Sequence, residues 1–169
     1  VNGVDYKREV FTSFVDQLVI VRLTASQPGK LTFSASLTCP QKVDVTVSGK
    51  NALILEGTTK GDDFTKGSIC FRADLKLDLQ SGKSVAGDTL LSVTNANSAT
   101  IYIAMATNFV NYKDISGNPS ERNKISMKNA GKNYARALQA HISAYQKYYN
   151  RVSLNLGRTS QADKPTDVR

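Results

Sequence analysis

The stretch SICFRADLKLDL, residues 68–79, decides the fold class of this chain. Its apolar and polar side chains alternate strictly, with Ile69, Phe71, Ala73, Leu75, Leu77 and Leu79 set against Ser68, Cys70, Arg72, Asp74, Lys76 and Asp78. A period of two is typical of a β-strand that has one face in a core. A shift by one residue would bury the four charged side chains, so the pairing of this strand is firmly set.

Similar short segments surround this strand and are separated by turn residues. Alternating or apolar segments occupy residues 4–13, 17–25, 31–37, 43–47, 52–56, 89–94 and 99–107. Pro28-Gly29 and the run from Asn95 to Ser98 have the composition of turns. About eight strands at this spacing indicate an antiparallel sheet structure. We therefore expect a mainly β fold, an antiparallel β-sandwich, over residues 1–110.

After residue 110 the period of the apolar residues changes from strand to helix. Asn118-Pro119-Ser120-Glu121 has the features of a helix start, because Asn118 can cap, Pro119 fits the first turn and Glu121 stands three residues after the cap. A second helix is predicted from an apolar stripe at steps of three and four, formed by Tyr134, Leu138, Ile142, Tyr145 and Tyr149. We expect residues 111–151 to be a helical linker segment.

The alternation of Val152, Leu154 and Leu156 predicts a returning strand, and Gly157 ends it. Residues 152–169 are therefore interpreted as a returning strand followed by a polar tail. The first residue is Val1 rather than Met, and it leads directly into a predicted strand. We expect the sequence to be a piece of a longer protein.

The net charge of +8 does not indicate a nucleic-acid partner. Residues 1–110 hold 11 Lys and Arg against 10 Asp and Glu, whereas residues 111–169 hold 11 against 4. The excess cations are spaced singly along the predicted helices, which is typical of a solvated helix face rather than a nucleic-acid footprint. No apolar run approaches the roughly 20 residues that span a bilayer. We expect neither nucleic acid nor membrane as a partner.

The titratable residues do not form a recognisable catalytic or metal-binding motif. Cys39, Cys70 and the single His141 cannot supply the four ligands, at short spacings, of a structural zinc site. A disulfide between the cysteines requires an oxidising compartment and neighbouring strands; the alternative is two half-buried free thiols. His141 lies beside the apolar stripe and is interpreted as a packing residue. We expect no catalytic residue, no metal and no cofactor in this chain.

Residues 105–112 stand where the last predicted strand leaves the sheet. Their sequence is MATNFVNY, and loops of this kind at strand exits often line clefts. The alternative is a turn whose side chains bind their own backbone. Both interpretations stay open on the sequence alone.

Several stretches together resemble a known family. They are residues 1–13, 16–17, 19–23, 99–103, 106–114 and 117–119, then His141, Tyr145, Asn150-Arg151-Val152, Leu154, Leu156-Gly157 and Pro165-Thr166-Asp167. In this order they closely resemble the amino-terminal domain of glycoside hydrolase family 95, the bacterial α-L-fucosidases and their relatives. The resemblance extends over essentially the whole chain, and it is specific through the combination of motifs.

The resemblance implies a parent enzyme in which an amino-terminal β-sandwich of many strands, a supersandwich, is joined by helices to an (α/α)₆ barrel. The chain would be the second half of that sandwich with its helical linker. The family's catalytic residues belong to the barrel, so none is carried over to this chain. The implied reaction is inverting hydrolysis of terminal α-L-fucosyl linkages in fucosylated glycans, without a cofactor. Thr107, Asn108 and Tyr112 are expected to face the boundary between sandwich and barrel, near the sugar.

Three further expectations follow. The fragment alone is expected to be inactive, and the family places the parent in the periplasm or outside the cell. Open strand edges and an exposed tyrosine stripe favour a homo-oligomer or a strand-swapped dimer. The rival interpretations are a carbohydrate-binding β-sandwich module and a parent enzyme that acts on a related sugar such as α-L-galactose.

Overall fold

The computed structural model describes residues 2–61, 63–131, 133–155 and 157–168. Within these ranges, nine strands come first along the chain and helices follow. The strands are β1 (Tyr6–Ser13), β2 (Leu18–Ala25), β3 (Leu31–Ser36), β4 (Val43–Ser48), β5 (Ala52–Thr58), β6 (Cys70–Gln80), β7 (Lys83–Ala86), β8 (Leu90–Ala96) and β9 (Ser98–Thr107). The helices are α1 (Pro119–Met127), α2 (Tyr134–Tyr149) and the short 3-10 helix η1 (Ser160–Asp163).

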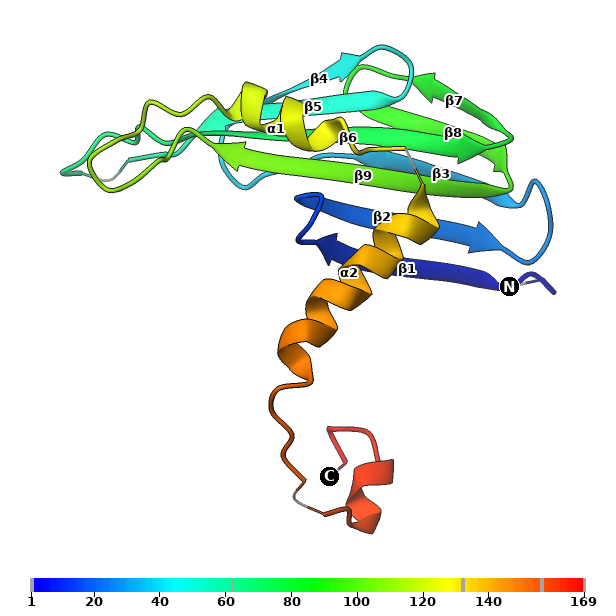
Figure 1. Ribbon diagram of the computed structural model, residues 1–169. Coiled ribbons are helices and arrows are strands. Elements are labelled where there is room, and N and C mark those ends of the chain that lie inside the picture. Colours follow the sequence, from blue (N-terminus) through cyan, green and yellow to red (C-terminus); the bar gives the residue numbers. More distant parts are fainter. Residues whose placement is uncertain (1, 62, 132, 156, 169) are drawn as a thin grey trace.

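The strands form two sheets that pack face to face (Figure 1). The large sheet has the order β1-β2-β9-β6-β5-β4, and the small sheet has the order β3-β8-β7. Neighbouring strands are antiparallel throughout both sheets. The core between them contains Leu53, Leu75 and Leu77 from the large sheet and Leu31, Leu91 and Val93 from the small sheet. The predicted mainly β fold, an antiparallel sandwich with a helical segment after it, is confirmed.

Strand β6 lies between β5 and β9, near the middle of the large sheet. Its register is the predicted one, because Leu75 and Leu77 are 4% and 1% exposed in the core. The opposite face differs from the expectation of a solvated polar face. The side chains of Arg72 and Asp74 there are only 16% and 15% exposed, because helix α1 lies over β6 and β9.

The sequence did not predict strand β7. This strand has only four residues, Lys83–Ala86, which is too short for an alternation to be recognised. It pairs with β8 and forms one edge of the small sheet. The strands predicted before residue 110 agree with the observed ones to within a few residues at each end.

The predicted returning strand is wrong for the part that the structure describes. Residues 152–155 are not in a strand, and Leu156 lies outside the described residues. Val152 and Leu154 are 82% and 78% exposed. An alternating segment becomes a strand only when it pairs with an edge, and this segment has no edge beside it among the described residues.

The predicted start of helix α1 is confirmed. The Asn118 side chain accepts a hydrogen bond of 3.2 Å from the backbone N–H of Glu121, and Pro119 occupies the first turn. Helix α2 is capped in the same way by Asn133, whose side chain accepts from the N–H of Arg136 at 3.0 Å. Both helices therefore begin at an asparagine that satisfies a free N–H.

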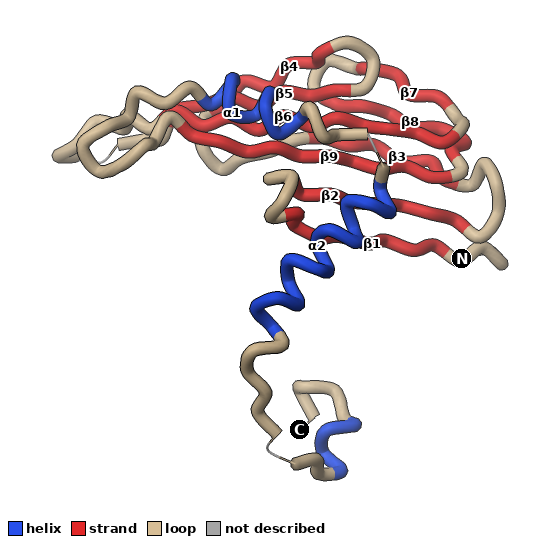
Figure 2. The backbone as a smooth tube through the Cα atoms, in the orientation of Figure 1, coloured by secondary structure: helices blue, strands red, loops and turns tan. Residues whose placement is uncertain are grey.

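The two helices cover the outer face of the large sheet, as Figure 2 shows in blue over red. Helix α1 contacts β6 and β9, whereas α2 contacts β1. A second core forms below the helices from Phe11, Leu18, Ile20, Tyr102, Ala104 and Ala130, with Met127, Tyr134, Ala137 and Leu138 packed against it. The molecule thus has three layers, and the C-terminal half of α2 extends beyond the sheet.

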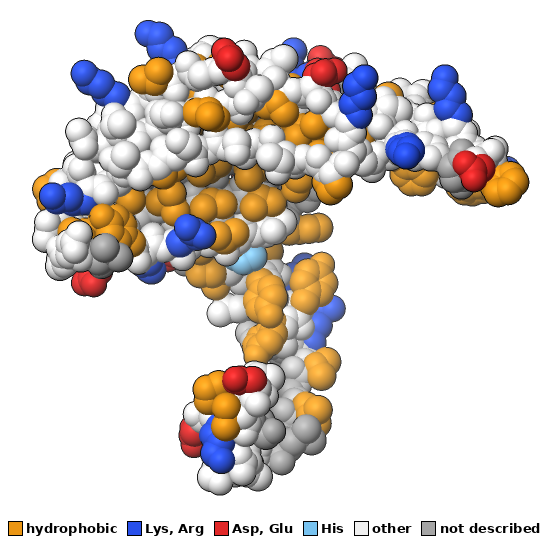
Figure 3. Space-filling model, turned by 180° about the vertical axis from the view of Figure 1, so that it is seen from behind, with side chains coloured by type: hydrophobic (Ala, Val, Ile, Leu, Met, Phe, Trp, Pro, Cys, Tyr) orange, Lys and Arg blue, Asp and Glu red, His pale blue; other side chains and the backbone are white. Residues whose placement is uncertain are grey.

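The small sheet covers only part of the large one. A groove of about 480 Å³ lies where the edge strand β3 meets the inner faces of β1 and β2. On this inner face Tyr6 and Val10 are 51% and 58% exposed. Figure 3, which views the molecule from behind, shows hydrophobic side chains gathered in the region of β1 and β2. The inner face of the large sheet is therefore incompletely buried at this end.

Candidate functional site

The three residues singled out in the sequence lie close together at the end of β9. Thr107 is its last residue, and Asn108 and Tyr112 belong to residues 108–117, which we call the exit loop. The exit loop and the loop between β5 and β6 project at the same end of the sandwich (Figure 1). The side chains of Thr107 and Asn108 form hydrogen bonds with backbone groups, whereas the side chain of Tyr112 is exposed.

Asn108 continues the pairing of β9 with β6 beyond the end of the strand. Its N–H donates to the carbonyl oxygen of Cys70 at 3.0 Å, and its side-chain Oδ1 accepts from the N–H of Cys70 at 3.0 Å. Its Nδ2 donates to the carbonyl oxygen of Ser68 at 3.2 Å. Thr107 acts locally, because its hydroxyl accepts from the N–H of Phe109 at 3.2 Å. The interpretation as a side chain that binds its own loop backbone is confirmed for Thr107, whereas Asn108 binds the backbone at the start of β6 instead.

A compact turn forms the tip of the exit loop. The N–H groups of Val110 and Asn111 both donate to the carbonyl oxygen of Asp114, at 2.9 Å and 3.0 Å. The Asp114 carboxylate accepts from the N–H of Ser116 at 2.8 Å. Hydrogen bonds from the side chain and backbone of Ser116 lower the pKa of Asp114 below its ordinary value. The tip therefore has a defined conformation although it is exposed.

Arg122 of helix α1 fastens the base of the exit loop. Its Nη1 donates to the carbonyl oxygens of Thr107 and Phe109, at 2.7 Å and 2.8 Å. Gly117 lies against the guanidinium, and its N–H donates to the carbonyl oxygen of Asn108 at 2.9 Å. Arg122 could not be identified from the sequence, since one arginine in a helix carries no signal of a long-range contact.

The side chains that the exit loop presents outward are mainly apolar. Tyr112 is 84% exposed, with the ammonium of Lys113 5.2 Å from its ring centre. Phe109, Val110 and Ile115 are 47%, 46% and 42% exposed. A pre-ordered loop with an exposed aromatic residue is suited to contact a partner surface or a sugar ring, because little conformational entropy is lost on binding.

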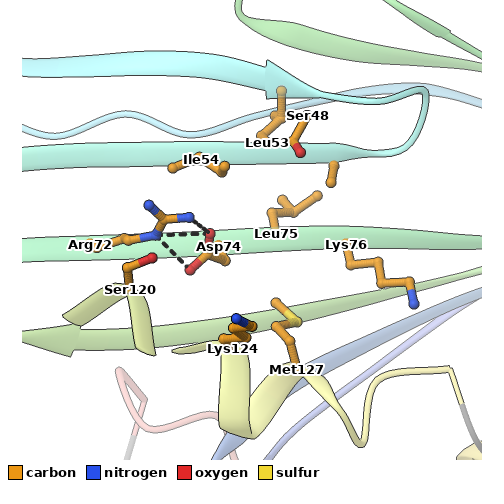
Figure 4. A pocket seen from close by; sticks show the side chains of 11 residues that line it. Ser48, Leu53, Ile54, Arg72, Asp74, Leu75, Lys76, Ser120, Lys124 and Met127 are labelled. Atoms are coloured by element: carbon orange, nitrogen blue, oxygen red, sulfur yellow. Dashed lines mark hydrogen bonds and ion pairs between the residues drawn. The ribbon is translucent and has the colours of Figure 1, made fainter. Parts of the chain in front are cut away.

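A polar network connects α1 to β6, and Figure 4 shows its Arg72–Asp74 pair on β6. Arg72 forms two hydrogen bonds with Asp74 through Nε, an ion pair of 2.7 Å with it through Nη2, and an ion pair of 2.8 Å with Glu56. The hydrogen bond with Asp74 raises the pKa of Arg72, which desolvation opposes. A cavity of about 330 Å³ lies beside this network, lined also by Ser120, Lys124 and Met127.

The fourth member of the network is Asn123 of α1, which is 1% exposed. Its Nδ2 donates to Asp74 Oδ2 at 2.7 Å and to the carbonyl oxygen of Arg72 at 3.2 Å. The carboxylates of Asp74 and Glu56 are therefore both engaged by Arg72, and Asp74 also by Asn123. This arrangement joins α1 to β6 through hydrogen bonds between polar side chains.

Aromatic rings line the face of α2 that carries the predicted stripe. The His141 ring lies 5.0 Å from Phe11 and 6.3 Å from Tyr145, so its packing role is confirmed. Tyr145 stacks on Tyr149 at 5.3 Å, yet these two rings are 57% and 64% exposed. Only the N-terminal half of the stripe packs on the sheet, which leaves the remaining tyrosines on the surface.

Across the described ranges, no three His, Cys, Asp or Glu side chains come together as metal ligands would. Cys39 and Cys70 are both free thiols. No helix in the described part of the chain has the length and apolar character to cross a bilayer.

Comparison with known proteins supplies the context of this site. Residues 1–112 match the family model described as "Glycosyl hydrolase family 65, N-terminal domain". The chain is also similar to a protein of Arabidopsis thaliana named Alpha-L-fucosidase 2, with 29% identity over 186 residues. That match covers 95% of this chain and 22% of the relative, so the chain spans about a fifth of the relative's length.

Proposed function

We propose, from the premise that this chain belongs to the glycosyl hydrolase family 65 N-terminal domain family, that it is the non-catalytic sandwich region of an α-L-fucosidase-like enzyme. The resemblance to glycoside hydrolase family 95 is the finer form of this proposal. The parent would hydrolyse terminal α-L-fucosyl linkages with inversion. The observation that supports α-L-fucosides as the substrate is the 29% identity, over 95% of this chain, to a protein named Alpha-L-fucosidase 2.

The proposed role of the chain in that parent is structural. The general acid and base would lie in a helical barrel outside these residues, and fucosylated glycans would reach the chain only through the parent. Inversion requires two carboxyls about 6.5–9.5 Å apart with room for a water between them. In the described network, Asp74 and Glu56 are instead held by Arg72, which supports a scaffold rather than a catalytic role.

Within this role, the exit loop is the proposed contact with the sugar-binding side of the parent. Tyr112 would make the contact, since it is the most exposed of the three singled-out residues. Thr107 and Asn108 would act on it indirectly, because their side chains bind backbone groups of the loop and of β6.

The experiment that tests the proposal uses two proteins, the 169-residue chain and the longer enzyme. NMR titration of the chain with L-fucose and 2′-fucosyllactose should give no saturable shift, and the same sample should release no fucose. The longer enzyme should hydrolyse α-L-fucosides and release β-L-fucose first, as inversion requires. Saturable binding by the chain without turnover would establish the binding-module alternative instead. Preference of the longer enzyme for α-L-galactosides would replace fucose as the substrate, and turnover by the chain would overturn the scaffold role.

Localisation and assembly are further parts of the proposal. The parent would be periplasmic or secreted, which fractionation of cells that express it tests. The chain alone would form a homo-oligomer or a strand-swapped dimer. The exposed apolar inner face at β1 and the exposed tyrosines of α2 support self-association.

A further inference from the structure

The Arg122 side chain forms hydrogen bonds with the backbone at the base of the exit loop. Its Nη1 is 2.7 Å from the carbonyl oxygen of Thr107 and 2.8 Å from that of Phe109. These two carbonyls flank the point at which the chain leaves β9. A guanidinium presents several N–H donors in a fixed plane, so it can hold two carbonyl groups at once in one geometry.

Gly117 closes the same contact from the other end of the loop. A Cβ at this position would lie 2.8 Å from Arg122 Nη2 and 2.9 Å from the carbonyl oxygen of Asn108. The loop's two ends therefore meet at the guanidinium, with the hydrogen bond from Gly117 N–H to the Asn108 carbonyl between them. A side chain larger than hydrogen would separate the ends.

The base from which Arg122 acts is itself fixed. The next residue, Asn123, is 1% exposed and bound to Asp74 and to the backbone of Arg72 on β6. Two neighbouring residues of α1 thus have separate partners, one in the sheet and one in the loop. A movement of the loop relative to α1 would have to break the Arg122 contacts.

We propose that Arg122 is the positioning residue of the exit loop and sets the orientation in which Tyr112 is presented. The functional consequence rests on the proposed role of Tyr112 in the parent enzyme, whereas the loop's dependence on Arg122 does not. Removal of the guanidinium leaves two carbonyls without their donor and the Gly117 end without its support. The tip should then sample many conformations while the sandwich stays folded.

The first test is amide hydrogen exchange, measured by NMR on the 169-residue chain. Arg122→Ala should speed exchange at the amides of Val110, Asn111 and Gly117 by roughly tenfold or more, with amides of β6 and β9 unchanged. Lys124→Ala is the matched control, because Lys124 is on the same helix with a side chain 70% exposed. Added methylguanidinium should restore protection to Arg122→Ala, whereas methylammonium at the same concentration should not.

Unchanged exchange in the loop of Arg122→Ala would overturn the proposal, as would a uniform increase through the whole sheet. If that variant does not fold, Gly117→Ala takes its place, since it displaces the guanidinium and leaves Arg122 present. It should also speed exchange in the exit loop alone, and normal protection there would contradict the positioning role.

The second test separates the loop's positioning from the parent's activity. In the longer enzyme, Arg122→Ala should lower kcat/KM for an α-L-fucoside, and the same change should have no further effect in a Tyr112→Ala background. Additive losses would overturn the claim that Arg122 acts through Tyr112. An enzyme without activity on fucosides would refute the proposed substrate, while the exchange measurements would still decide the role of Arg122.

Discussion

Asn123 in the middle of α1 donates a hydrogen bond of 2.7 Å to Oδ2 of Asp74 in the middle of β6. The contact joins a helix to a sheet through two polar side chains where apolar packing would be the usual solution. Asp74 is also held by Arg72, so both of its carboxylate oxygens accept hydrogen bonds. Such a network is stabilising only while it is complete, because a buried polar group without a partner is costly.

Asn123→Ala should therefore destabilise the chain by about 2–3 kcal/mol, since it removes the hydrogen bonds from Asn123 to the Asp74 carboxylate and to the Arg72 carbonyl. Urea unfolding of the variant measures the free energy of unfolding. Lys124→Ala, at the next and mostly exposed position, should change it by less than about 0.5 kcal/mol. Equal effects of the two substitutions would contradict the role given to the network.

Truncation of Asn108 should lower the stability of the chain, whereas truncation of Tyr112 should lower the activity of the longer enzyme. Asn108→Ala removes the side-chain hydrogen bonds to Cys70 and Ser68 and should cost about 1–2 kcal/mol of stability. Tyr112→Ala should leave the melting temperature of the chain unchanged but weaken the activity of the longer enzyme. Thermal unfolding and kcat/KM measured on both variants test this division. A loss of stability in Tyr112→Ala would show that the ring packs rather than binds.

Stability should fall at alkaline pH because of Tyr102. Burial raises the pKa of this 3% exposed phenol above its ordinary value of 10.0, the charge of Asp78 adds to the effect, and Arg22 opposes it. A raised pKa in the folded state means that the stabilisation is complete below pH 10 and is lost as the pH rises through the raised value. Tyr102→Phe should show a shallower decline above pH 10 in urea unfolding. Identical slopes for both proteins would contradict this assignment.

Self-association of the chain should depend on the uncovered inner face of β1. Val10 lies there and is 58% exposed, so Val10→Thr should weaken the concentration-dependent association seen by sedimentation velocity. Val85→Thr is a matched control, because Val85 is 63% exposed on β7, at the far edge of the small sheet. A wild-type chain that sediments as a monomer at every concentration would rule out the proposed assembly.

The sequence was most informative where a residue's neighbours along the chain determine its environment. The register of β6 follows from the alternation around Leu75 and Leu77, and the start of α1 follows from Asn118 and its local hydrogen bond. In both cases the residues that form the pattern and the structure that they determine lie within a few positions of each other in the sequence.

Long-range contacts explain what the sequence did not predict. The partners of Asn123 and Arg122 lie 49 and 15 residues away in the chain, and neither residue type indicates such a contact. The same reason explains the error at Val152 and Leu154, where the alternation is present but a neighbouring strand edge is not. The proposed site was found only in part, since the sequence identified Tyr112 and Asn108 but could not separate the exposed residue from the one that holds the loop.

The unequal widths of the two sheets also restrict the symmetry that two copies can adopt. An antiparallel pairing of two β3 strands would have its twofold axis perpendicular to the small sheets, which puts both large sheets on the same side. In each copy, strand β1 of the large sheet extends beyond the β3 edge of the small sheet, and the groove lies between β1 and β3. The two overhangs would then occupy the same space above the seam. Two β3 edges therefore cannot pair with each other about a twofold axis. A single extended strand could still pair with β3, because it has no second sheet that would clash.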